Sequence, residues 1–171
     1  NKAELEYGNN SNDTTKGNPV VVTTPTYPLD IEKTDTKGTL LEGAKFRLYK
    51  NEGDAKAAND NAIKVTGSNG SYTVAENQNT ESNMDMVTKK TEVSAGYNLH
   101  LNGLKAGTYW LVEKEAPAGY NKLTAPIKIT ITQDGENELK WTVSKDNVPE
   151  DDKIIDVENT TGTILPGTGG M

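Results

Sequence analysis

Three strand-like segments each place one polar side chain where the alternation of residues predicts a buried hydrophobic one. In chain order these series are Leu29, Ile31 and Lys33; Tyr109, Leu111 and Glu113; and Ile155, Val157 and Asn159. Residues two apart on a strand share a face of the sheet, so each polar residue lies in line with core positions. Fraying of the pattern at strand ends explains one such residue alone. An amine, a carboxyl group and a carboxamide together favour a chemical explanation.

An amine and a carboxamide can condense into a new amide if both are held in a dry interior. Burial disfavours ions, so a lysine there loses its proton more readily and a carboxyl group there holds its proton longer. We therefore predict that the neutral amine of Lys33 attacks the carboxamide carbon of Asn159 while Glu113 hydrogen-bonds the carboxamide and shuttles protons. Ammonia leaves, and the new bond joins the first and last strands of the domain.

The segments that must position these residues are predicted β-strands. The alternating stretches are 27–35, 44–50, 107–113, 127–131, 139–143 and 154–159. Asn69 and Gly70 predict one hairpin turn, and residues 133–135 predict a second, between strands 127–131 and 139–143. Hydrophobic residues make up only 33% of the chain, with 16 glycines and 7 prolines. Because no long apolar helical period is present either, the sequence predicts an all-β fold.

Residues 51–98 are predicted to be mostly loop, because glycine and asparagine interrupt their short apolar runs. The acid and amide side chains in 54–61 suggest calcium binding, but they lack the alternating spacing of oxygen ligands, so a solvated loop is favoured. A short helix around 84–90 is an alternative for part of this region. His100 points away from its flanking leucines and is predicted to be an exposed histidine.

Composition and charge exclude several classes of function. The 171 residues include no cysteine, which excludes disulfides and thiolate metal sites, and the single histidine leaves no histidine cluster for a metal. A net charge of −7 opposes binding to nucleic acid or anionic lipid, because phosphate groups are bound by a basic face. The sequence contains no signal peptide or membrane span, as expected of either a fragment of a longer precursor or a cytosolic protein. No cofactor is predicted.

The stretch 109–120 reads Tyr-Trp-Leu-Val-Glu-Lys-Glu-Ala-Pro-Ala-Gly-Tyr. It resembles the E-box of Gram-positive pilins and CnaB-type adhesin domains, Tyr-x-Leu-x-Glu-Thr-x-Ala-Pro-x-Gly-Tyr, and departs from it only at Lys114. The resemblance covers roughly residues 27–169 and implies an immunoglobulin-like β-sandwich of the CnaB type. It also implies that Lys33 and Asn159 form an intramolecular isopeptide bond and that Glu113 is its catalytic acid.

The end of the chain carries a second motif. Leu165, Pro166, Gly167, Thr168 and Gly169 match the LPxTG sorting motif of sortase substrates. The resemblance implies that a sortase cuts between Thr168 and Gly169 and passes the threonyl carbonyl to an amine of a neighbouring pilin subunit or of peptidoglycan. The family pattern continues into an apolar stretch and basic residues, so we expect the chain to be a truncated form of a longer product.

The expected organisation has three parts. Residues 1–24 are expected to be the tail of a preceding domain and a linker, with a disordered leader as the alternative. Residues 25–161 are expected to form the CnaB-type domain, and residues 162–171 the sorting tail. The resemblance thus implies the C-terminal domain of a backbone pilin, secreted and held at the bacterial surface.

Two other classes of function compete with the pilus subunit. One is a stalk or ligand-binding domain of a wall-anchored adhesin that does not polymerise, which tandem copies of the module would favour. The other is a glycosidase, since Glu113 and Glu115 resemble paired catalytic carboxylates. No aromatic sugar-binding cleft is recognisable, so we predict that the chain is not an enzyme beyond one self-cross-linking reaction. The sequence identifies no host ligand.

Overall fold

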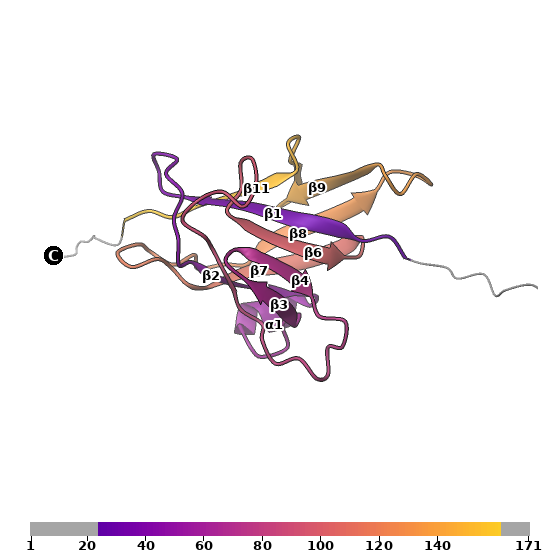
Figure 1. The fold of residues 1–171 in the computed structure, drawn as a ribbon, viewed down its shortest axis with the longest axis horizontal. Helices are drawn as coiled ribbons and strands as arrows, with labels where there is room; N and C mark the ends of the chain where they lie inside the picture. Colours follow the sequence, from indigo (N-terminus) through magenta and orange to yellow (C-terminus); the bar gives the residue numbers. More distant parts are fainter. Residues whose placement is uncertain (1–23, 162–171) are drawn as a thin grey trace, which may run out of the picture.

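The computed structural model describes residues 24–161. The sorting tail at 162–171 and residues 1–23 of the predicted linker lie outside the described residues. Within the described range the chain forms two packed β-sheets and one short helix (Figure 1). The predicted all-β sandwich is therefore confirmed.

Five strands form the first sheet, in the order β11-β1-β6-β4-β3. They are β1 (Tyr27–Thr34), β3 (Val65–Ser68), β4 (Ser71–Val74), β6 (Leu99–Leu104) and β11 (Ile154–Glu158). Six strands form the second sheet, in the order β10-β9-β8-β7-β2-β5. They are β2 (Lys45–Tyr49), β5 (Met86–Val87), β7 (Gly107–Glu115), β8 (Ile127–Gln133), β9 (Trp141–Lys145) and β10 (Val148–Pro149). The first and last strands, β1 and β11, are parallel neighbours in which Lys33 pairs with Val157 (Figure 1).

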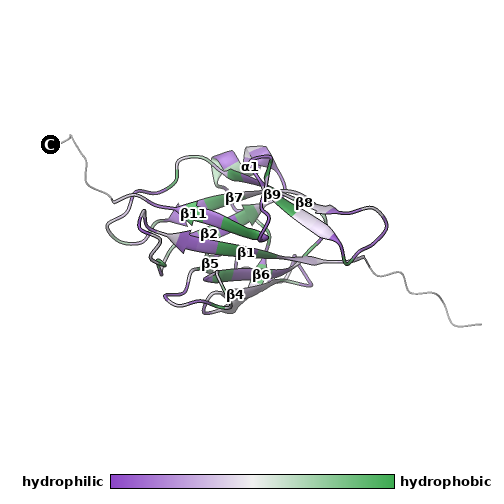
Figure 2. Cartoon of the chain, turned by 90° about the horizontal axis from the view of Figure 1, so that it is seen from above, coloured by the Kyte–Doolittle hydropathy of each residue, from purple (hydrophilic) through white to green (hydrophobic). Residues whose placement is uncertain are grey.

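The hydrophobic core fills the space between the two sheets. Every second residue of β1 is buried from Tyr27 to Lys33, and the same alternation in β7 buries the side chains from Tyr109 to Glu113. Strands in Figure 2 accordingly alternate between hydrophobic and hydrophilic residues. The period of two in the sequence thus fixes which side chains meet between the sheets, and it carries one lysine and one glutamate into that space.

The helix α1 (Glu52–Ala57) corrects the loop prediction for the start of residues 51–98. The side chain of Asn51 caps it by accepting a hydrogen bond from the backbone N–H of Asp54, at 3.0 Å. α1 lies outside β7, on the side away from β6 and β4 (Figure 2). There Ala55 packs with Tyr49 and partly buried neighbours in a second, smaller hydrophobic cluster. The alternative helix at 84–90 is wrong, because that segment contains strand β5.

The two predicted hairpins differ in their turns. Asn69 and Gly70 connect β3 to β4, both with positive φ (52° and 77°), as a two-residue hairpin turn of the primed type requires. Strands β8 and β9 pair as predicted, but β9 begins only at Trp141. Leu139, predicted to lie in a strand, is in the connecting loop and 84% exposed.

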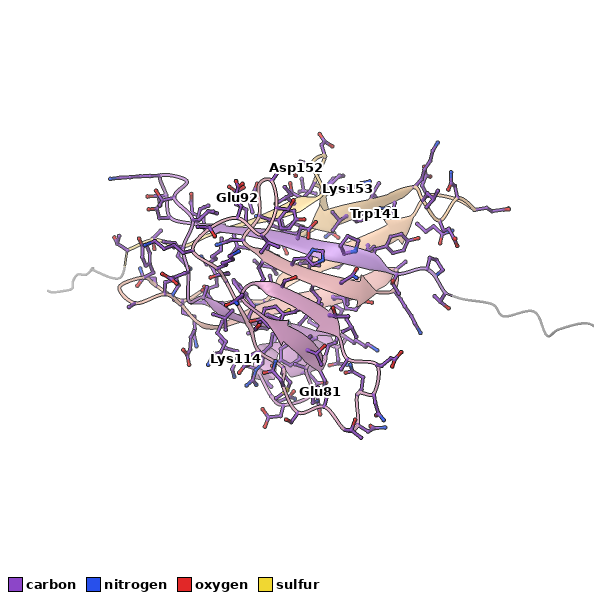
Figure 3. All side chains as sticks on the ribbon, in the orientation of Figure 1. Glu81, Glu92, Lys114, Trp141, Asp152 and Lys153 are labelled. Atoms are coloured by element: carbon purple, nitrogen blue, oxygen red, sulfur yellow. The ribbon has the colours of Figure 1, made fainter. Side chains whose placement is uncertain are left out.

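One end of the core is closed by aromatic rings. Trp141 packs against the buried Tyr27 with ring centroids 5.3 Å apart, and the amine of Lys153 lies 4.5 Å above the Trp141 ring. Figure 3 shows Trp141 and Lys153 close to Asp152 at the margin of the sandwich. An ammonium over an indole face adds about 0.5–1 kcal/mol at such a partly exposed site. Trp141 thus packs on the edge of the core, with Tyr27 beneath it and Lys153 above it.

Candidate cross-linking site

The three polar residues singled out in the sequence come from three strand positions and meet between the sheets. Lys33 lies near the end of β1, and Asn159 follows the last residue of the neighbouring strand β11. Glu113 comes from β7 in the facing sheet. Their exposed fractions are 0% for Lys33, 2% for Glu113 and 1% for Asn159. Lysine and glutamate are almost never buried to this degree unless they are paired.

The carboxyl group of Glu113 lies between the amine and the carboxamide. Its Oε2 is 3.8 Å from Nζ of Lys33, and its Oε1 accepts a hydrogen bond from Nδ2 of Asn159 at 3.1 Å. One oxygen therefore faces the amine, which is the nucleophilic group, while the other holds the nitrogen of the carboxamide. A single acid in this place contacts both partners of an amide-forming reaction.

The segment between β7 and β8 supplies two further contacts. The backbone N–H of Leu123 donates to Oε1 of Glu113 at 2.9 Å, and the backbone carbonyl of Asn121 accepts from Nδ2 of Asn159 at 2.9 Å. Both neighbours of the Asn159 carboxamide nitrogen are thus acceptors. The carboxamide must direct its NH₂ group toward them, which leaves its carbonyl oxygen pointing elsewhere.

Three buried side-chain atoms in the described part of the chain have no hydrogen-bond partner: Nζ of Lys33, Oε2 of Glu113 and Oδ1 of Asn159. Each belongs to a different member of the trio. An orphaned polar atom in a protein interior costs about 1–3 kcal/mol, and more when it is charged. Unbonded, the trio is an unfavourable arrangement, and an amide bond between Lys33 and Asn159 would remove the unpaired buried amine by converting Nζ into an amide nitrogen.

Burial also changes the acid–base behaviour of the amine. It lowers the pKa of Lys33 to about 8, because the ammonium ion loses its hydration, while the negative charges of Glu113 and Glu158 oppose that effect. About one amine in ten is then neutral at pH 7, against fewer than one in a thousand for an ordinary lysine. The fraction of Lys33 in the neutral, nucleophilic form is therefore far larger than that of an ordinary surface lysine.

A buried asparagine that the sequence analysis missed fixes the backbone of Lys33. Oδ1 of Asn98 accepts from the backbone N–H of Lys33 at 2.8 Å, and its Nδ2 donates to the carbonyls of Leu41 and Lys89 at 3.1 and 2.9 Å. Asn98 is 0% exposed and lies just before β6. No local pattern marks it, because its partners lie in three separate segments.

A cleft of about 340 Å³ lies beside the site, between α1, β7 and the segment that leads into β8. Its lining includes Glu113, Leu123 and Lys122, together with Lys114, the position that departs from the E-box. The amine of Lys114 donates to the carbonyl of Ala58 at 3.0 Å, just after the end of α1. In Figure 3 this side chain lies on the same side of the molecule as the helix. The substituted lysine therefore holds the helix rather than the trio.

Other residues considered from the sequence have different surroundings. Glu115 is exposed and pairs with Lys45 at 3.4 Å, so it does not share the dry environment of Glu113. His100 is only 24% exposed at its side chain and lies 2.6 Å from Asp30, so the prediction of an exposed histidine is wrong. Within residues 24–161 there is no group of three or more side chains suited to a metal ion. Helices long and apolar enough to cross a membrane are likewise missing from the described range.

Comparison with known proteins gives the family. Residues 28–145 match the model of the SpaA prealbumin-like fold domain, a range that contains Lys33 and Glu113. The chain therefore belongs to this family of domains. A search of curated protein sequences gives no match.

Solved structures with a similar fold include three pilins. GBS52, the minor pilin of Streptococcus agalactiae, is 21% identical with a TM-score of 0.51, over 84% of this chain and 48% of that one. The group B streptococcus pilus 2b backbone protein is 25% identical with a TM-score of 0.46, over 90% and 47%. The shaft pilin SpaA of Lactobacillus rhamnosus GG is 18% identical with a TM-score of 0.46, over 85% and 50%. The chain spans about half the length of these structures.

Proposed function

We propose that this chain is a structural domain of a Gram-positive surface pilus subunit, locked by an isopeptide bond between Lys33 and Asn159 and attached to its neighbour by a sortase. The observation that carries the proposal is the set of three unsatisfied buried atoms, one from each of Lys33, Glu113 and Asn159. The fold shared with the minor pilin GBS52 supports the pilus assignment. The protein is structural, and its one reaction is its own maturation.

The reaction begins with proton transfer from Lys33 to Glu113. Oε2 of Glu113 lies 3.8 Å from Nζ of Lys33, and burial makes the ammonium ion of Lys33 give up its proton more readily than that of an exposed lysine. The neutral amine then attacks the side-chain carbonyl carbon of Asn159, and a bond forms between Nζ and that carbon. Both reactants are held by the fold, and good alignment is worth up to ~7–11 kcal/mol in intramolecular reactions.

Collapse of the tetrahedral intermediate breaks the bond between the carbonyl carbon and Nδ2. Glu113 serves this step because its other oxygen, Oε1, already accepts a hydrogen bond from Nδ2. The carboxyl group gives the proton taken from Lys33 to the departing nitrogen, so ammonia leaves, and Glu113 then takes the extra proton from the new amide nitrogen. Ammonia accepts that proton from Glu113 and leaves as ammonium, so Glu113 ends as it began. The products are one secondary amide and one ammonium ion, and the cleft beside Glu113 provides a route to solvent for it.

The sorting motif completes the proposed function. Cleavage between Thr168 and Gly169 gives a threonyl carbonyl that is transferred to an amine of the next subunit or of peptidoglycan. Incubation of the full chain with a sortase and a glycine-based amine should give an adduct at Thr168 with release of residues 169–171. A Leu165→Ala variant is the matched control and should stay unmodified. A wild-type chain that forms no adduct would contradict this part of the proposal.

Intact mass measurement tests the cross-link. The wild type should be lighter than its sequence requires by about 17 Da, the mass of one ammonia. Lys33→Met, Asn159→Ala and Glu113→Gln should each have the full calculated mass, since each lacks one member of the trio. Lys45→Met, which removes a half-buried lysine of β2, is the matched control and should keep the deficit. A folded wild type of full mass would overturn the proposed bond.

A further inference from the structure

A short segment after β7 contacts both the acid and the acceptor of the proposed reaction. We call residues 120–123 the strap. The backbone N–H of Leu123 donates to Glu113, and the carbonyl of Asn121 accepts from Asn159. The strap also forms a bridge between Tyr120 and Thr161, just past the end of β11. One stretch of four residues thus touches Glu113, Asn159 and the chain that follows Asn159.

We propose that Asn121 is a positioning residue for the cross-linking reaction, which fixes the carboxamide of Asn159 with its nitrogen turned toward Glu113. The proposal rests on the proposed function, because it assigns a role within that same reaction. It concerns the rate of bond formation and not the identity of the bond.

The backbone of Asn121 determines which way the carboxamide faces. Nδ2 of Asn159 has two hydrogens, and two oxygens are in place to accept them, one from Glu113 at 3.1 Å and one from the main chain of Asn121 at 2.9 Å. A flipped carboxamide would set its oxygen against both acceptors. The strap therefore selects the orientation in which the leaving nitrogen lies next to the proton donor.

The side chain of Asn121 holds the backbone that makes this contact. Its Nδ2 donates to Oγ1 of Thr160 at 3.1 Å and to the carbonyl of Thr161 at 2.9 Å. Its backbone N–H donates to the carbonyl of Thr160 at 2.9 Å. Three hydrogen bonds thus tie the strap to the two residues that follow Asn159. Strand β11 ends at Glu158, so its ladder of hydrogen bonds does not include Thr160 and Thr161. The bonds from Asn121 hold these two residues in place instead.

The side chain of Asn121 is exposed, so its contribution is these hydrogen bonds and not core packing. Both of its bonds use the NH₂ group as donor, and only an amide of this length supplies two donors at that place. Asn121→Ala removes both donors. Asn121→Asp keeps the shape and also removes both, since a carboxylate only accepts.

The experiment follows ammonia loss during refolding of the full 171-residue chain. Protein from inclusion bodies is dissolved in denaturant, where the trio is apart, and diluted into native buffer. Intact mass gives the bonded fraction with time, and circular dichroism gives the folded fraction. Both variants at Asn121 should form the bond roughly ten- to a hundredfold more slowly per folded molecule than the wild type. Thr160→Val, which removes one acceptor and keeps the shape, should be slowed less.

Gln78→Ala is the matched control. Like Asn121, Gln78 is an exposed amide side chain that donates to two backbone carbonyls, those of Lys64 and Ala75, but it lies away from the trio. It should lose stability without slowing bond formation. The pH at which the rate reaches half of its plateau should be the same in the Asn121 variants and the wild type. A change in the position of Asn159 leaves the burial of the Lys33 amine unchanged. If the substitution instead exposed the Lys33 amine to water, the pKa of Lys33 would rise and that pH would move upward.

The outcomes separate the two proposals. If the wild type loses ammonia and the Asn121 variants do so at the same rate per folded molecule, the positioning role is wrong and the cross-link stands. If Gln78→Ala slows the reaction as much as Asn121→Ala does, the effect is one of stability and the positioning role is again wrong. A folded wild type that loses no ammonia overturns both proposals.

Discussion

Replacing Asn159 with alanine removes the acceptor and leaves Lys33 as a free amine in the core. In the wild type the proposed bond closes a loop of roughly 125 residues, and in the chain-entropy account such a closure stabilises the fold by about 4–5 kcal/mol. The variant loses that contribution.

The free amine adds a second cost that depends on pH. The pKa of Lys33 is lowered from 10.5 to about 8 in the folded protein because burial disfavours the ammonium ion. At neutral pH this difference corresponds to about 3 kcal/mol of folding free energy. Together with the lost loop closure, the destabilisation is comparable with the whole stability of an ordinary domain, about 5–15 kcal/mol.

The sign of the pH effect follows from which state holds the proton. Between about pH 8 and pH 10.5 the unfolded chain keeps a proton on Lys33 that the folded chain has lost, so stability rises with pH across this window. Below pH 8 both states hold the proton and the full cost remains. Asn159→Ala should therefore gain up to about 3 kcal/mol between about pH 7 and pH 10.5. In a wild type that carries the proposed bond, Lys33 would be an amide and would not titrate, so this gain would be missing.

Chemical denaturation at several pH values measures the effect. Lys33→Met is the control, because it also lacks the bond but has no buried amine. It reports what the other lysines and the tyrosines contribute over the same range. The stability of Asn159→Ala relative to Lys33→Met should increase as pH rises. The same pH dependence in both variants would refute the reasoning, since Lys33 would then not be titrating in a dry interior.

Two further substitutions test the framework around the site. Asn98→Ala should destabilise the domain by about 1–3 kcal/mol in denaturant titrations, because it leaves the buried backbone N–H of Lys33 unpaired, while the carbonyl of Leu41 keeps its bond from Thr88; a loss below about 0.5 kcal/mol would show that water replaces the amide. Gly67→Ala should lower the melting temperature strongly, because its Cβ would lie 2.3 Å from the carbonyl oxygen of Ser71 at a φ of 129°. Gly38→Ala, also at positive φ but with no atom within 4 Å of a Cβ, should cost less, and equal losses would contradict the steric argument.

That the three polar residues face the core could be predicted from the sequence, because the alternation of residues within one strand decides which face each side chain occupies. Once Leu29 and Ile31 are assigned to the core, Lys33 must follow them, and the same holds for Glu113 on β7. The pairing of β1 with β11 was less accessible, since it depends on which strands become neighbours. The E-box resemblance implied that Lys33 and Asn159 meet, but not that their strands pair. It did not reveal the helix α1, although Asn51 followed by acids in the first turn is a recognisable helix start.

The parts that the sequence did not reveal are contacts made by loops. Asn98 joins the backbone of Lys33 to residues 41 and 89, and Asn121 joins the segment between β7 and β8 to the chain after β11. An asparagine in a loop has no periodic neighbours that would mark it as buried or as bonded. The prediction of an exposed His100 failed for a different reason. Its phase on β6 was correct, but the partner that partly buries it, Asp30, lies 70 residues away in sequence.

The parallel alignment of β1 and β11 decides how a tensile load would pass through the domain. The described chain enters at the start of β1 and leaves after β11 at the opposite end of the long axis (Figure 1). With Lys33 joined to Asn159, tension runs along β1, crosses near its far end and leaves at once, so the residues in between carry none of it. Unravelled, they would span roughly 400 Å. The proposed cross-link would keep that length from extending under load, so the domain would behave as a stiff link and not as a spring.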